Sequence, residues 1–220
     1  MALALESAAE TQEPSVVGRA ELSALPDGSH ALALATPEGP LLFRAFFARP
    51  SAGAVVLAGP PAFAEIFAEM ALRFSAQGAA CLVSLPRDAA EAERALAAGA
   101  RWLRRTRPER LVLVGAADAA EAAMHCARPL DAEALLLLSP TSPPGPRAQD
   151  ELCGRPLIVA AGEDDAPARA YAFLPHTRIH SFPLAGAALA QVQGDLLACC
   201  MPALAQALFP GAGSPGRNRA

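Results

Sequence analysis

The 220-residue chain contains no lysine, and all 18 of its basic residues are arginines. A Walker-type phosphate loop needs a lysine amine at the nucleotide phosphates, and a Schiff-base enzyme needs one as its nucleophile. Neither glycine that follows a predicted strand, Gly59 or Gly115, begins a G-x-G-x-x-G sequence. Pro60 and Pro61 also lack the amide hydrogens that a pyrophosphate group would need. The sequence therefore excludes Schiff-base chemistry and argues against a phosphate-binding turn at these places.

Long apolar runs and basic clusters are also absent. The composition is 53% hydrophobic, but no run approaches the about 18 apolar residues of a membrane span. The first 14 residues carry Glu6 and Glu10 and no basic residue, which is not the pattern of a secretory signal. The net charge is −4 and the arginines are scattered, so we expect no nucleic-acid partner.

The five cysteines are odd in number and none stands in a C-x-x-C spacing. This usage is typical of free thiols in a reducing compartment, and we expect a cytoplasmic protein with neither a metal ion nor a cofactor. The adjacent Cys199 and Cys200 are the one pair that could be redox-active.

The length suits one domain. Residues 1–28 are Ala-rich and end in the turn Pro26-Asp27-Gly28, and we expect this N-terminal segment to be partly disordered. Residues 29–209 alternate between strand-like and helix-like segments and form the predicted domain. Residues 210–220 have the Gly, Pro, Ser and Arg composition of a disordered tail.

Eight apolar runs within this domain predict strands. The turn Pro37-Glu38-Gly39-Pro40 joins the first two as a hairpin. The later runs are continuously apolar, as in a parallel sheet that helices cover on both faces. The predicted strands are 30–36, 41–47, 54–59, 79–85, 110–115, 134–139, 156–161 and 178–183.

Helices are predicted between these strands. In 62–77, apolar residues recur every three or four positions, and Gly78 stands where a C-cap belongs. The predicted helix 89–106 follows Asp88. Asp88 and the glutamate three residues later resemble a capping box. A last apolar stripe runs to Leu208, and Pro202 should kink or break its helix. The predicted fold class is α/β, with a mostly parallel eight-stranded sheet and helices on both faces.

The order of these elements resembles the α/β-hydrolase family. An antiparallel pair leads to a strand that ends at Ala58-Gly59, and a later strand leads into 115–119 (Gly-Ala-Ala-Asp-Ala). Residues 156–165 (Pro-Leu-Ile-Val-Ala-Ala-Gly-Glu-Asp-Asp) resemble the strand that delivers the family's catalytic acid. The resemblance covers residues 30–209. Because little sequence lies between residues 139 and 153, it implies a member without a lid domain.

The resemblance implies a nucleophile elbow, G-x-S-x-G, at residues 115–119. Ala117 occupies the nucleophile position, and a methyl group cannot attack a substrate. A frame shifted by one residue would place Asp118 at the tip, as in family branches that use a carboxylate nucleophile. The structural alternative for Asp118 is an acid at a helix N-terminus, where the helix dipole favours it.

The family's histidine should follow the last strand, but the expected positions hold Ala187 and Leu189. No histidine follows His180, and both His180 and His176 lie in or before the last predicted strand. A lone strand histidine is usually structural or exposed to solvent, although its pKa permits switching.

The resemblance also places an oxyanion-hole amide after Gly59 and the catalytic acid near residue 165. Pro60 and Pro61 cannot donate from that loop, since proline has no amide hydrogen. The acid position holds Asp165, or alternatively Asp164. The structural alternative for Asp165 is an N-cap of the helix that begins near Pro167.

These losses predict a pseudoenzyme of the serine hydrolase type that binds a small molecule or acts as a scaffold. The alternative is an active hydrolase of ester or related bonds, with Asp118 as nucleophile and His176 or His180 recruited. A third hypothesis is a partner subunit of an active paralogue.

Any ligand should lie at the carboxyl ends of the strands. The polar residues expected on that rim are Arg87, Asp88, Asp118, Ser139, Thr141, Ser142, Asp164 and Asp165. Residues 60–65 (Pro-Pro-Ala-Phe-Ala-Glu) also resemble, with one inserted alanine, a Pro-Pro-Phe-Ala-Glu run in hydrolase-like proteins that accompany bacterial exopolysaccharide and exosortase systems.

Overall fold

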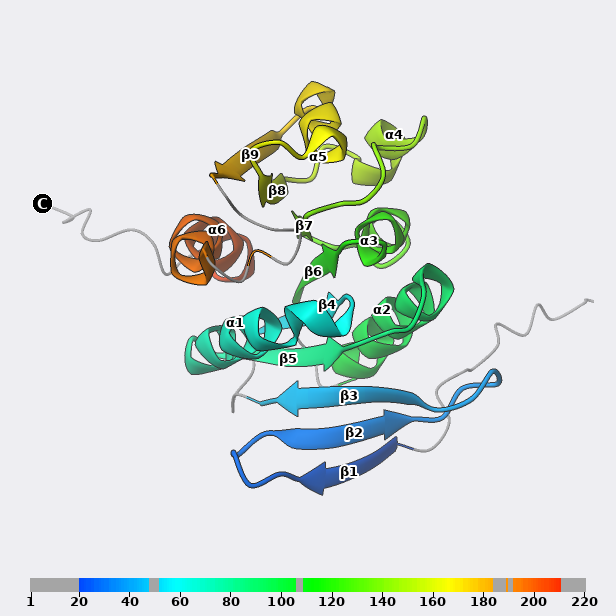
Figure 1. Cartoon of the computed structure of the whole chain (residues 1–220). Coiled ribbons are helices and arrows are strands. Elements are labelled where there is room, and N and C mark those ends of the chain that lie inside the picture. Colours follow the sequence, from blue (N-terminus) through cyan, green and yellow to red (C-terminus); the bar gives the residue numbers. More distant parts are fainter. Residues whose placement is uncertain (1–19, 48–51, 106–108, 184–188, 190–191, 211–220) are drawn as a thin grey trace, which may run out of the picture.

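A computed structural model describes residues 20–47, 52–105, 109–183, 189 and 192–210. Nine strands form one sheet in the order β1-β2-β3-β5-β4-β6-β7-β8-β9 (Figure 1). Strands β1, β2 and β3 pair antiparallel, and β3 is antiparallel to β5. From β5 onward all neighbours are parallel.

The strands are β1 (Ala20–Ala24), β2 (His30–Leu34), β3 (Leu41–Phe46), β4 (Gly53–Ala58), β5 (Ala79–Ser84), β6 (Arg110–Ala116), β7 (Ala134–Leu138), β8 (Leu157–Gly162) and β9 (Thr177–Phe182). The helices are α1 (Ala64–Ala76), α2 (Ala89–Arg104), α3 (Ala119–Ala127), α4 (Ala148–Leu152), α5 (Ala166–Ala170) and α6 (Gln193–Leu208), with 3₁₀ turns η1 (Pro61–Phe63) and η2 (Tyr171–Phe173).

All eight predicted strands are present, and the prediction of a mostly parallel sheet is confirmed. The predicted number of strands is wrong, because β1 adds a ninth. This strand lies within the N-terminal segment 1–28 and pairs with β2 along its full length. The predictions for residues 1–19 and 211–220 lie outside the described residues.

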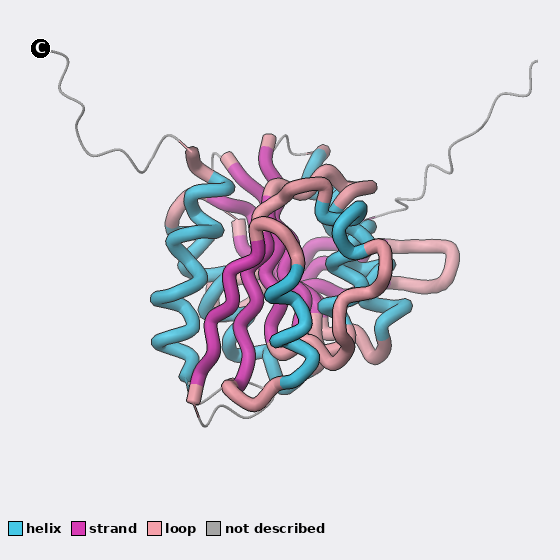
Figure 2. The backbone as a smooth tube through the Cα atoms, turned by 90° about the horizontal axis from the view of Figure 1, so that it is seen from above, coloured by secondary structure: helices cyan, strands magenta, loops and turns pink. Residues whose placement is uncertain are grey.

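Two hydrophobic cores lie on opposite faces of the sheet. Helices α1 and α6 cover one face, and α2, α3 and α4 cover the other (Figure 1). Figure 2 shows helices on both sides of the strands. Strands β4, β5 and β7 are buried at every position, which explains why their sequences are uninterrupted apolar runs. The connection between β7 and β8 contains only the five-residue helix α4, so no lid domain is inserted there.

The helix ends follow the predictions in part. Gly78 has a φ of +99° just after α1, as a C-cap glycine does. At the start of α2, the Asp88 carboxylate accepts from the amide of Glu91 at 2.7 Å. The Glu91 carboxylate accepts from the amide of Arg87 at 2.9 Å rather than from Asp88, so only half of the capping box forms. Of the expected kink or break at Pro202, the break is wrong, because α6 continues through this exposed proline.

The cysteines differ sharply in accessibility. Cys81, Cys126 and Cys200 are buried, whereas Cys153 and Cys199 are exposed. Burial raises the pKa of Cys126 to about 12 and that of Cys200 to about 12. Since only the thiolate reacts with an alkylating agent, we expect iodoacetamide at pH 8 to modify Cys153 and Cys199 in the native protein.

Peptide mapping by mass spectrometry measures which cysteines react. In urea all five should be modified. Modification of a third cysteine in the native protein, at a rate near that of Cys153, would show that the predicted protection is wrong.

Candidate functional site

The corner between β6 and α3 has the shape that the sequence predicted. Ala117 stands between the strand and the helix with a φ of +51°, a left-handed conformation that residues with a side chain rarely adopt. Its amide donates to the carbonyl of Leu138 on β7 at 2.9 Å, and its carbonyl accepts from the amide of Ala120 at 3.1 Å. Ala117 is therefore the tip of a tight strand-turn-helix corner.

Gly115 fixes the frame of this corner. A Cβ atom at Gly115 would lie 2.4 Å from the carbonyl oxygen of Ala119 and 2.8 Å from Cα of Ala120, so strand and helix approach too closely for any side chain. Asp118 lies one residue beyond the tip with a right-handed φ of −65°. It is exposed, and its carboxylate makes no cap bond to α3 but accepts from the hydroxyl of Thr141. The geometry matches the frame with Ala117 at the tip.

A second left-handed residue ends the neighbouring strand. Ser139 has a φ of +41°, and its amide donates to the carbonyl of Ala160 at 2.8 Å. The sequence placed Ser139 on a polar rim, but its side chain is only 5% exposed. Its hydroxyl has no hydrogen-bond partner among the described residues. Ser139 is thus a buried polar group beside the corner.

The expected histidine position after the last strand is apolar. Leu189 is fully buried, has a φ of +55°, and its carbonyl accepts from the amide of Val192 at 3.2 Å. It belongs to the core cluster against which Ala117 also packs. Ala187 lies outside the described residues.

The structure does not bring His176 or His180 to Asp118. His176 precedes β9 at the amino ends of the parallel strands, whereas Asp118 follows the carboxyl end of β6. His180 is level with Ala116 in the sheet register, but β7 and β8 lie between them. Three strand spacings separate His180 from β6, a distance of about 14 Å.

The loop after β4 packs tightly against the corner. A Cβ atom at Gly59 would lie 2.8 Å from Cβ of Ala116, and the Gly59 amide donates to Ser84 at 3.4 Å. Pro60 and Pro61 follow without amide hydrogens. The amide of Asp118 has no acceptor among the described residues, so it can donate to a group placed at the corner.

Asp165, at the position predicted for the catalytic acid, caps a helix. The Asp165 carboxylate accepts from the amide of Ala168 at 3.1 Å, as the N-cap of α5, which confirms the structural alternative for this residue. Asp164 is exposed, and its carbonyl accepts from Arg169 at 3.3 Å.

Four of the predicted site residues come together at the carboxyl edge. Pro60, Arg87, Asp88 and Asp118 line a cavity of about 50 Å³, which has room for one or two water molecules. Arg87 and Asp88 are already engaged through Glu91. Within the described ranges, no group of three or more His, Cys, Asp or Glu could hold a metal ion, and no helix is long and apolar enough to cross a membrane.

The chain is similar to solved α/β-hydrolase structures. An α/β serine hydrolase without a lid from Xanthomonas campestris is 19% identical, with a TM-score of 0.61 over 88% of this chain and 99% of that chain. A dienelactone hydrolase from Anabaena variabilis is 18% identical, with a TM-score of 0.64 over 88% and 98%. An α/β serine hydrolase homologue from Coxiella burnetii is 14% identical, with a TM-score of 0.59 over 76% and 95%.

No family model and no curated protein matches the chain by sequence. The structural likeness, together with the sheet order, shows that the chain has the α/β-hydrolase fold without a lid.

Proposed function

We propose that this protein is a non-catalytic member of the α/β-hydrolase fold group, a pseudoenzyme that binds a small molecule or acts as a scaffold. The observation that carries the proposal is Ala117, a methyl group at the left-handed tip of the β6–α3 corner. In serine hydrolases of this fold, the residue at that tip supplies the attacking oxygen. Free cysteines are typical of proteins in a reducing compartment, so we also propose that the protein is cytoplasmic.

Two further features support the proposal. An acyl-transfer enzyme needs a base to take the proton of its nucleophile, and the position expected for that base holds the buried Leu189. It also needs amide donors for the oxyanion, each worth about 10²–10³ in rate, and Pro60-Pro61 cannot supply one. Loss of a nucleophile or base alone costs about 10⁶-fold, so these losses together leave no acyl transfer.

Hydrolysis of p-nitrophenyl acetate and butyrate tests the proposal. We expect the purified protein to release p-nitrophenol no faster than buffer. The Ala117→Ser variant should be equally inactive toward both esters, since a serine without a base is not activated.

The active-hydrolase alternative makes a different prediction for the same assay. If the wild-type protein turned over either ester, and Asp118→Asn abolished that activity while the exposed control Asp195→Asn did not, the proposal would be wrong. The enzyme would then use the carboxylate of Asp118.

A further inference from the structure

A second cavity lies at the opposite edge of the sheet from the β6–α3 corner. It has a volume of about 450 Å³, within the range of small-molecule sites. It is bounded by the amino ends of β7, β8 and β9 and by the last turns of α6. Its lining residues are Ala134, Pro156, Leu157, Ile158, His176, Thr177, Arg178, Ala203, Gln206 and Ala207.

The cavity has an apolar floor and a polar mouth. Its apolar lining includes Ala134 and Ile158, which are at most 2% exposed, and the half-buried Ala203 and Ala207 of α6. Arg178 and Gln206 are exposed and bring polar groups to the same space from β9 and α6. A ligand that suits this arrangement has an apolar part for the floor and a polar group for the mouth.

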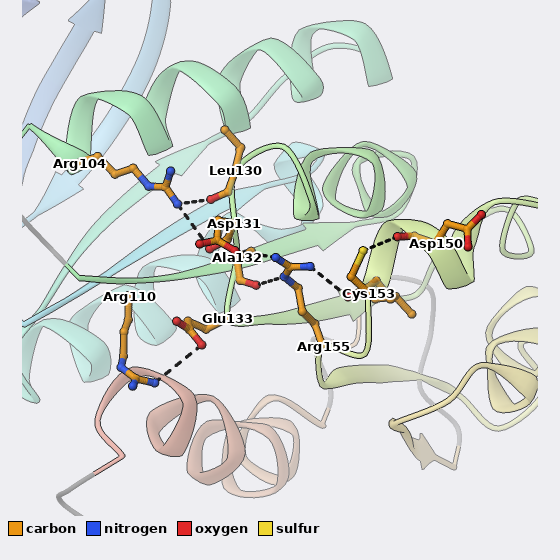
Figure 3. A network of polar contacts seen from close by, with 10 residues as sticks. Arg104, Arg110, Leu130, Asp131, Ala132, Glu133, Asp150, Cys153 and Arg155 are labelled. Atoms are coloured by element: carbon orange, nitrogen blue, oxygen red, sulfur yellow. Dashed lines mark hydrogen bonds and ion pairs between the residues drawn. The ribbon is translucent and has the colours of Figure 1, made fainter.

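The other arginines near this edge are already engaged, as Figure 3 shows. Arg155 donates to the carbonyl of Ala132 and to the carboxylate of Asp131 at 2.7 Å. Arg110 donates to the carbonyl of Ala207 at 3.1 Å and lies 3.8 Å from Glu133. These contacts hold the start of β7 and the end of α6 in place, so two walls of the cavity are braced.

Arg178 differs from these arginines. Within the described part of the chain it has no hydrogen-bond or ion-pair partner. A guanidinium group presents a planar fork of donors that matches a carboxylate, and this pair of hydrogen bonds is stronger than that of neutral groups. The mouth of the cavity therefore offers an unpaired cation beside a buried apolar floor.

We propose that this cavity binds a small monocarboxylate with an apolar tail. The carboxylate pairs with Arg178 at the mouth, and the tail lies against Ile158 and the alanines of α6. This site is separate from the β6–α3 corner, so the proposal holds whether or not that corner is catalytic.

Calorimetric titration of the full chain with octanoate tests the proposal. We expect octanoate to bind with a Kd of about 1 mM or tighter. Arg178→Gln should weaken binding about tenfold, since one charge-assisted pair is lost. Arg101→Gln, at an exposed helix position on the other face of the sheet, is the matched control and should bind as the wild type does.

Two further measurements distinguish the contribution of the apolar tail from that of the carboxylate. Octan-1-ol carries the same tail without the carboxylate, so it should bind more weakly than octanoate and should not respond to Arg178→Gln. Ala203→Phe fills the cavity and should abolish binding of both ligands, with folding checked by thermal denaturation. The proposal is overturned if the folded wild type does not bind octanoate, if Arg178→Gln leaves the affinity unchanged, or if the folded Ala203→Phe variant still binds octanoate as the wild type does.

Discussion

Replacing Gly115 with alanine should lower the free energy of unfolding by about 3 kcal/mol or more. The new methyl carbon would lie 2.4 Å from the carbonyl oxygen of Ala119. That atom and the Cα of Ala120 belong to the backbone of α3, so no side-chain rotation can relieve the contact. The helix must move away from β6, and the contacts of its buried face with the sheet are lost. Urea denaturation followed by circular dichroism measures the effect.

Gly145→Ala is the matched control. A Cβ atom at Gly145 meets no atom within 4 Å, and its φ is not in the left-handed region. This substitution should change the stability by less than about 1 kcal/mol and is expected to raise it, because alanine restricts the unfolded chain. Equal midpoints for the two variants would contradict the close approach of β6 and α3, and with it the assignment of Ala117 to the tip.

The sequence predicted most of the sheet because its buried strands have a simple signature. Strands such as β4 and β7 are covered on both faces, so every position is apolar. Strand β1 escaped prediction for the opposite reason. Its residues, Ala-Glu-Leu-Ser-Ala, alternate between apolar and polar over only five positions, and all five are exposed, so no apolar run marks the segment. Its backbone pairing with β2 places it in the sheet, and backbone pairing leaves little trace in side-chain chemistry.

The corner could be predicted because a close backbone approach requires glycine. Gly115 marked the frame, and the tip followed two residues later. The left-handed conformations of Ser139 and Leu189 could not be predicted, because such φ values are rare for serine and leucine and their local sequence does not encode them. The amide of Ser139 likewise bonds to Ala160 on β8, which is distant in the sequence.

The cavity at the opposite edge was not predicted at all. Its lining comes from four separate segments, the starts of three strands and the last turns of α6, and no motif connects them. The expected effect of Pro202 on the last helix is one reason why the cavity could not be predicted. A break in α6 at Pro202 would have removed Ala203 and Gln206 from a regular helix, whereas the observed helix carries both to the cavity.

Leu189→Ala should cost about 3 kcal/mol of stability, because it removes a fully buried side chain and leaves a cavity in the core. Leu85→Ala is the matched control. Leu85 is 42% exposed, and its replacement should cost less than about 1 kcal/mol. The difference between the two midpoints in urea measures how firmly residue 189 belongs to the core.

Leu189→His tests whether the same position could hold a catalytic histidine. An imidazole at 189 would replace apolar contacts by ring nitrogens that must find partners or remain unsatisfied, so the variant should be at least as unstable as Leu189→Ala. On our proposal that residue 189 stands at the histidine position of the serine hydrolases of this fold, a catalytic histidine here would have to face a nucleophile. A Leu189→His protein as stable as the wild type would therefore mean that residue 189 faces an open crevice. Our placement of Leu189 in the core would then be wrong, and the case against a catalytic centre beside Ala117 would lose one of its supports.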